Sequence, residues 1–254
     1  MLKKRIIPIL TSNGFTLVKT KQFKNPRTVG NPIQTARVFN LRNVDELVFI
    51  DIMATKQNRK QNLLLLKNII KECYMPVAIG GGIKTLFDIE QVLRIGADKV
   101  IIASSFYDDI DFVKEAIDKF GSQCINVALD VYKSEYGYCS INDNTPIDKL
   151  IEKVNYLKIG EVILTSVDYE GKQNGFDDEL YSTYAKKFNM PLIINGGASK
   201  PSDFGNEKYS KYVSGYGASS IYVYTEFTPL DIKIELKSKN IPTRITSANK
   251  LINY

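Results

Sequence analysis

The sequence contains no histidine and only three cysteines. Without histidine, the chain alone cannot form a Ser-His-Asp or Cys-His catalytic site, or a zinc site with histidine ligands. Cys73, Cys124 and Cys139 are odd in number and lack the spacing of metal ligands, so we predict neither a metal site nor a cofactor. General acids and bases must therefore come from Asp, Glu, Lys, Tyr or Cys, and carboxylates are the first candidates.

The 254 residues also lack linkers, low-complexity tracts and long apolar runs. No segment approaches the length of a membrane span, and the basic residues 1–5 lead into an apolar run that is too short for a signal peptide. The formal charge of +6 comes from basic residues spread along predicted helices, which favours a solvated lysine-rich surface. We therefore expect a cytoplasmic protein of one domain, residues 1–254, without a nucleic-acid or membrane partner.

Two glycine-rich stretches are the strongest motifs. Residues 76–83 and 191–198 are each a short apolar run opened by proline and closed by glycines. Such runs are typical of parallel strands that are buried on both faces and end in a tight turn. The free N–H groups of a glycine turn suit an anion such as phosphate. One glycine pair could simply make the bend, but two matched copies favour phosphate turns.

The two stretches are separated by close to half the chain, which indicates an internal duplication with halves of roughly 1–122 and 123–254. Strand-like and helix-like runs alternate from end to end, as in repeated βα units. We therefore predict a single (β/α)8 TIM barrel. Its strands are expected near residues 5–10, 46–51, 76–80, 99–103, 125–130, 161–166, 191–195 and 219–224. Helices are expected near 32–41, 63–73, 85–94, 109–120, 146–157 (capped by Asn144 or Thr145), 177–188, 201–213 and 228–239, followed by a loose tail at 243–254.

A long basic segment, residues 12–31, separates the first strand from the first helix. It carries Lys19, Lys21, Lys24 and Arg27. Because loops that follow barrel strands lie on the active face, the segment is predicted to be a lid that holds anionic substrate groups. A disordered basic insertion is the alternative.

Several further motifs share one family pattern. They comprise residues 5–7, 18–19, 45–51, 80–83, 96–100, 120–123, Asp130, 160–166 and 196–198. Taken together, and extending to about residue 227, they resemble HisF, the cyclase subunit of imidazole glycerol phosphate synthase. Residues 5–10, 17–20 and 23–26 look closer to its HisF-like branch of the WbuZ type, which is associated with amidation of surface-polysaccharide sugars.

The resemblance implies a lyase or synthase that works as a two-part enzyme. A HisH-like glutaminase would form a heterodimer with this chain and release ammonia, which would pass along the barrel axis to a phosphorylated small-molecule substrate. Arg5, Glu46, Lys99 and Glu161 match the family's charged ring, an ammonia gate at the entrance, and Asp98 matches its docking edge for the glutaminase. From placement alone, a stabilising role of the four charged residues is the simpler interpretation.

The resemblance also assigns residues at the opposite end. Asp130 matches one of two catalytic aspartates of the family. The positions matched to phosphate or substrate binding are Lys19, Gly81, Gly82, Ser104, Thr165, Glu170, Gly171, Gly196 and Gly197.

Several positions at this end depart from the family pattern. Thr11 stands where the second catalytic aspartate is expected, and a threonine hydroxyl cannot act as a general acid near neutral pH. Ala103 replaces an asparagine, and Glu170 is longer than the family's aspartate. Tyr222 and Val223, at the predicted end of the eighth strand, stand where a small residue and a serine are expected, and would fill or reshape the second phosphate pocket.

A retained entrance with an altered exit favours one functional hypothesis, an ammonia-conducting synthase subunit that feeds a sugar amidotransferase. Two alternatives stay open. The chain could be an authentic cyclase of histidine biosynthesis that uses water or Glu170 in place of the missing acid. It could also be a non-catalytic activator of the glutaminase that conducts ammonia without chemistry of its own.

Overall fold

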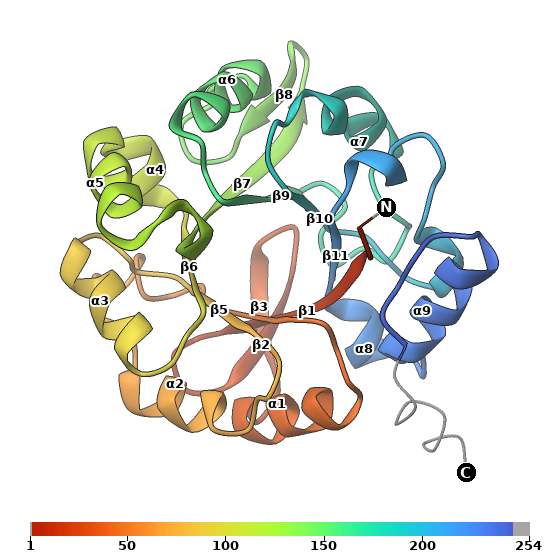
Figure 1. Cartoon of the computed structure of the whole chain (residues 1–254), viewed down its shortest axis with the longest axis horizontal. Coiled ribbons are helices and arrows are strands. Elements are labelled where there is room, and N and C mark those ends of the chain that lie inside the picture. The colour runs from red at the N-terminus through yellow and green to blue at the C-terminus, as the bar shows by residue number, and fades with distance from the viewer. Residues whose placement is uncertain (1, 246–254) are drawn as a thin grey trace.

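The computed structural model describes residues 2–245. Within them, eight parallel strands close into a barrel, because β1 pairs with β4 on one side and with β11 on the other (Figure 1). This arrangement confirms the predicted TIM barrel. The barrel strands are β1 (Arg5–Ser12), β4 (Leu47–Asp51), β5 (Val77–Gly80), β6 (Lys99–Ile102), β7 (Ile125–Ser134), β9 (Glu161–Ser166), β10 (Leu192–Asn195) and β11 (Gly215–Ala218). The division into two half-barrels stays a prediction.

Helices form an outer ring around the barrel (Figure 1). They are α1 (Pro32–Leu41), α2 (Leu63–Ile70), α3 (Leu86–Arg94), α4 (Ser104–Asp108), α5 (Ile110–Phe120), α6 (Ile147–Leu157), α7 (Asp178–Tyr184), α8 (Ser220–Tyr224) and α9 (Pro229–Ser238). None of these helices is both long and apolar enough to cross a membrane, and the search covered the described residues.

Side chains alternate between the inside of the barrel and the layer under the helices. On β7, Ala128 belongs to an apolar cluster inside the barrel, whereas Val127 and Leu129 pack in the core between strands and helices. Since alternate residues of a strand share one face, Asn126 and Asp130 point inward with Ala128. The interior therefore presents one row of side chains from each strand.

The position predicted for the eighth strand, 219–224, is wrong. β11 covers Gly215–Ala218, and the run that follows it is helix α8. A Cβ atom at Gly215 would lie 2.8 Å from Cδ1 of Ile7, and one at Gly217 would lie 2.7 Å from Cδ1 of Ile9. The strand thus needs small residues against bulky neighbours, and it lacks the β-branched residues that mark a strand in sequence.

Two helix predictions also need correction. The segment 201–213 contains two short 3-10 turns, η3 (Pro201–Asp203) and η4 (Ser210–Tyr212), in place of a helix. Helix α6 has Pro146 at its N-cap and no side-chain cap, so neither Asn144 nor Thr145 caps it. Both residues belong to the turn that precedes the helix. There Asn144 has a φ of 59°, and the Thr145 hydroxyl donates a hydrogen bond to the Asp143 carboxylate.

The basic segment 12–31 is an antiparallel hairpin rather than a disordered insertion. Its strands are β2 (Leu17–Lys21) and β3 (Lys24–Gly30), joined through Gln22 and Phe23. The φ angles of these two residues are 53° and 60°, as a tight two-residue hairpin turn requires. A second ribbon pairs the end of β7 with β8 (Gly137–Ser140). The predicted loose tail, 243–254, lies mostly outside the described residues.

Candidate functional site

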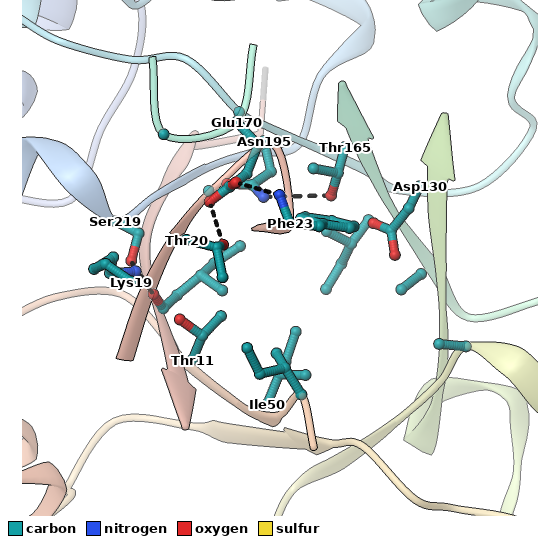
Figure 2. Close-up of a pocket in the computed structure, with 18 of the residues that line it drawn as sticks. Thr11, Lys19, Thr20, Phe23, Ile50, Asp130, Thr165, Glu170, Asn195 and Ser219 are labelled. Atoms are coloured by element: carbon teal, nitrogen blue, oxygen red, sulfur yellow. Dashed lines mark hydrogen bonds between the residues drawn. The ribbon is translucent and has the colours of Figure 1, made fainter. Parts of the chain in front are cut away.

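A cavity of about 330 Å³ opens at the carboxyl ends of the barrel strands (Figure 2). All eight barrel strands, or the loops that follow them, contribute to its walls. Its wall contains most of the residues predicted for catalysis and substrate binding, namely Thr11, Lys19, Gly81, Ser104, Asp130, Thr165, Glu170, Gly171, Gly196 and Gly197. Gly82 is the predicted residue that is absent from the wall.

The two glycine turns bring their backbones close to neighbouring chain segments. Gly81 has a φ of 94°, and a Cβ atom there would lie 2.1 Å from the carbonyl oxygen of Asp51. Gly197 has a φ of 98°, and its Cβ atom would lie 2.0 Å from the carbonyl oxygen of Gly175. Packing alone therefore requires glycine at both turns. Their role in phosphate binding stays a prediction.

Asp130, at the end of the inward row on β7, is the carboxylate that faces the cavity across from β1. Burial raises the pKa of its carboxyl to about 6, with a smaller contribution from the negative charge of Glu170, while hydrogen bonding with Thr165 acts in the opposite direction. A carboxyl group that titrates near neutral pH can both accept and return a proton. The geometry therefore suits Asp130 for acid–base chemistry.

Thr11 lies on the opposite side of the cavity from Asp130 (Figure 2). Its hydroxyl donates a 2.5 Å hydrogen bond to the carbonyl oxygen of Val18 on β2. The bond ties the basic hairpin to β1 and uses the only proton that the side chain can offer. Thr11 thus has a structural contact where the family pattern calls for an acid.

Lys19, on the hairpin strand β2, is buried against the start of α8. Its ammonium group donates to the Ser219 hydroxyl and, at 3.5 Å, to the carbonyl oxygen of Ile9. Burial lowers the pKa of Lys19 to about 8, although the charge of Glu170 acts in the opposite direction. Lys19 lines the cavity and has no direct ion pair with a carboxylate among residues 2–245, so its charge is available to an anion.

Glu170 fastens the hairpin over the cavity. Its carboxylate accepts hydrogen bonds from the Thr20 hydroxyl and the Phe23 N–H group, both at 3.1 Å. Burial raises the pKa of Glu170, while these hydrogen bonds and the charge of Lys19 act in the opposite direction. Figure 2 shows the Phe23 ring pointing across the cavity toward Asp130. The predicted lid is therefore positioned at the mouth, and its opening and closing stay a prediction.

The four residues predicted as a charged ring lie together at the other end of the barrel. Arg5 pairs with Glu46 at 2.7 Å and with Glu161, and Lys99 pairs with Glu46 at 2.9 Å and with Glu161 at 3.0 Å. Although burial alone would raise the pKa of Glu161, its hydrogen bonds and ion pairs with Arg5 and Lys99 lower it. The ring is closed by mutual ion pairs, and its role as a gate stays a prediction.

The ring and the cavity are separated by an apolar layer. Along β9, Glu161 belongs to the ring, Ile163 to the apolar cluster inside the barrel, and Thr165 to the cavity wall. Asp98 immediately precedes β6 at the ring end, and its carboxylate accepts a 2.8 Å hydrogen bond from the Val77 N–H group. It is exposed there, and its predicted contact with a glutaminase is untested.

Comparison with known proteins identifies the family. Residues 5–228 match the family described as "Histidine biosynthesis protein". A Campylobacter jejuni protein whose name assigns it provisionally to imidazole glycerol phosphate synthase as subunit hisF2 is 41% identical over 252 residues, covering 96% of this chain and 100% of the relative. The chain belongs to the HisF family. The imidazole glycerol phosphate synthase subunit HisF of Dehalococcoides mccartyi is 36% identical over 96% of this chain and 99% of the relative. A Pseudomonas aeruginosa protein, also provisionally named hisF2, is 35% identical over 88% and 92%.

Membership of the HisF family confirms the resemblance found in the sequence, but one supposed departure from the HisF pattern is wrong. Tyr222 and Val223 do not end the eighth strand, because they lie on α8. The residues that follow β11 are Ser219 and Ser220, and both line the cavity. A small hydroxyl residue is therefore present at this position, and the end of the eighth strand is not filled by bulky side chains.

Sequence reasoning missed several cavity residues. Asn195 ends β10 directly before the glycine turn, and its side chain donates to the Thr165 hydroxyl at 3.3 Å. Functional residues of a TIM barrel lie at the carboxyl ends of its strands, so the end of the predicted strand 191–195 was a sufficient signal for Asn195. The same signal would have indicated Ser219 if the last strand had been placed correctly. No sequence signal indicates that Phe23 reaches the cavity, because its position depends on the hairpin turn.

Proposed function

We propose that this chain is an ammonia-conducting synthase subunit that pairs with a HisH-like glutaminase and supports amidation of a surface-polysaccharide sugar by a partner amidotransferase. The observation that carries the proposal is the hydrogen bond from Thr11 to the Val18 carbonyl oxygen. Because Thr11 uses its hydroxyl proton in this bond, β1 supplies neither the carboxylate that the HisF resemblance assigns to this position nor a free proton donor opposite Asp130.

The entrance supports the first part of the proposal. The ring contains two cationic and two anionic side chains, Arg5, Lys99, Glu46 and Glu161, so its formal charges cancel. A neutral molecule such as ammonia meets no net charge there, and the apolar layer behind the ring disfavours ions because they would lose their hydration. The arrangement suits a small neutral nitrogen source.

The cavity supports a phosphorylated substrate. Two glycine turns offer backbone N–H groups at its rim, and the buried Lys19 supplies a positive charge. Asp130 would accept a proton from the nitrogen that attacks the substrate. Two relatives are named hisF2 rather than HisF, although both names provisionally assign them to imidazole glycerol phosphate synthase.

One observation favours a second candidate, an authentic cyclase of histidine biosynthesis. Glu170 lines the same cavity, and its carboxyl has a raised pKa, so it could return a proton to the substrate in place of the acid that is missing at position 11.

A direct assay separates the two candidates. The purified chain is supplied with the substrate of imidazole glycerol phosphate synthase and an ammonium salt. Our proposal expects no measurable ring closure by the wild-type chain. A cyclase that tolerates Thr11 closes the ring and gains little rate in Thr11→Asp. Ring closure that is lost in both Asp130→Asn and Glu170→Gln would contradict it and establish the cyclase.

A second experiment tests for a purely non-catalytic role. Pathway output and glutaminase binding are measured in cells that carry Asp130→Ala or Asp98→Ala. A catalytic subunit loses output in Asp130→Ala although it still binds the glutaminase. A non-catalytic channel keeps its output in Asp130→Ala and loses it in Asp98→Ala, which would weaken docking.

A further inference from the structure

Asn126 is a polar residue in the interior of the barrel. It begins the inward row of β7, which continues with Ala128 in the apolar cluster and Asp130 in the cavity wall. Asn126 pairs in register with Glu161 on β9, so it lies at the level of the charged ring. Its exposed fraction is 0%. The side chain therefore marks the boundary between the ring and the apolar cluster.

The two ends of the Asn126 amide are in different situations. Its Nδ2 group donates a 3.1 Å hydrogen bond to Oε2 of Glu161. Because a carboxylate can only accept, this contact determines that the NH2 end faces Glu161. The carbonyl oxygen Oδ1 is buried and has no hydrogen-bond partner among residues 2–245. A buried acceptor without a donor costs free energy, so the site favours a small molecule that can donate.

The surroundings limit what that molecule can be. On one side of Asn126 along the barrel lies the charged ring, whose formal charges cancel. On the other side lies the apolar cluster of eight side chains. A cation at this boundary would lose its hydration without gaining a free counter-charge. A neutral donor avoids this cost. Ammonia is neutral, small and carries three N–H donors.

We propose that the side-chain carbonyl oxygen of Asn126 is a binding point for ammonia on the barrel axis, between the charged ring and the apolar cluster. The inference rests on the proposed function, because it assumes that ammonia crosses the barrel. It adds a specific acceptor at the step where ammonia leaves the ring and enters an environment that offers no hydrogen bonds. Water is the competing occupant, since it is also a small neutral donor.

Nuclear magnetic resonance of the side-chain amides tests this inference on the intact chain. The 15N–1H signals of the Asn126 NH2 group are assigned through their loss in Asn126→Val. Ammonium chloride is then added at a pH where about half of it is free ammonia, and potassium chloride is added to a matched sample. The side-chain amide of Asn155, which donates to the Lys187 carbonyl oxygen on the surface, serves as the control.

We expect a saturable shift of the Asn126 signals, larger than their line width, with ammonium chloride and none with potassium chloride or at Asn155. An absent shift, or an equal shift in both salts, would overturn the inference and leave water as the occupant. The result is independent of partner binding. A chain that shows the shift but never binds a glutaminase supports the ammonia site and contradicts the proposed function. A chain that binds the glutaminase but shows no shift contradicts the ammonia site and leaves the proposed function standing.

Discussion

The two ends of the barrel treat their charges in opposite ways. At the ring end, ion pairs lower the pKa of Glu161 and raise that of Arg5, although burial acts in the opposite direction on both. At the cavity end, burial raises the pKa of Asp130 to about 6 and lowers that of Lys19 to about 8. The charges of Glu161 and Arg5 are thus held in place by their ion pairs, whereas Asp130 and Lys19 are ready to exchange protons near neutral pH. The difference separates a structural or gating role from a chemical one.

The largest effect is expected where charges are paired. Glu161→Ala leaves Arg5 and Lys99 with one carboxylate between them, and we expect a loss of about 3–5 kcal/mol in the free energy of unfolding. Urea denaturation measures it. The control is Glu90→Ala, which removes surface pairs with Arg94 and Lys119 and is expected to cost less than about 1 kcal/mol. Equal losses in the two variants would show that the ring is no more stabilising than a surface pair.

At the cavity end, removing a carboxylate should raise the free energy of unfolding, whereas at the ring end it should lower it. Asp130 has a raised pKa, so between about pH 4 and pH 6 the folded state holds more protons than the unfolded state, and stability falls as pH rises. Asp130→Asn removes this penalty. We expect the variant to be about 1–3 kcal/mol more stable than the wild type at pH 7, with the difference vanishing below about pH 4.

The same substitution should lower synthase turnover at least about 100-fold, because acid–base catalysis contributes that much or more. Denaturation at several pH values and turnover with a glutaminase partner measure the two effects. A stability difference that is constant between pH 4 and pH 7 would contradict a raised pKa. Unchanged turnover would contradict the catalytic role of Asp130.

A smaller effect concerns the backbone that shapes the cavity. Gly81→Ala must adopt a positive φ and also displace the Asp51 carbonyl group, whereas Gly137→Ala has a φ of 108° with no neighbouring atom within 4 Å. Both variants carry the cost of the strained backbone. We expect Gly81→Ala to lose at least about 2 kcal/mol more than Gly137→Ala in urea denaturation, because its clash with backbone adds to that cost. Similar losses would show that the turn near the cavity can relax.

Most of the fold could be predicted from the sequence, because seven of the barrel strands are apolar runs bounded by turn residues. The eighth strand was missed because its glycines are required by close packing against Ile7 and Ile9, which lie on a strand far away in sequence. Most predicted cavity residues were found for one reason: parallel strands end at the same edge of the barrel. Two features depend on three-dimensional packing, which no local pattern encodes. They are the contact of Thr11 with Val18 and the lack of a hydrogen-bond partner for Oδ1 of Asn126 within the described part of the chain.

The smallest effect tests the substituted acid position. Thr11→Val keeps the shape of the side chain but removes the hydrogen bond to Val18, which should cost about 1 kcal/mol. Because this bond ties the hairpin to β1, the loss should appear as faster amide hydrogen exchange in β2 and β3, with the ring end unchanged. Thr28→Val, at an exposed position on the same hairpin, is the matched control. If Thr11→Val instead abolished turnover while hairpin exchange stayed at the wild-type rate, the hydroxyl would act on the substrate, and the contrast between the two ends would have to include Thr11 among the reacting groups.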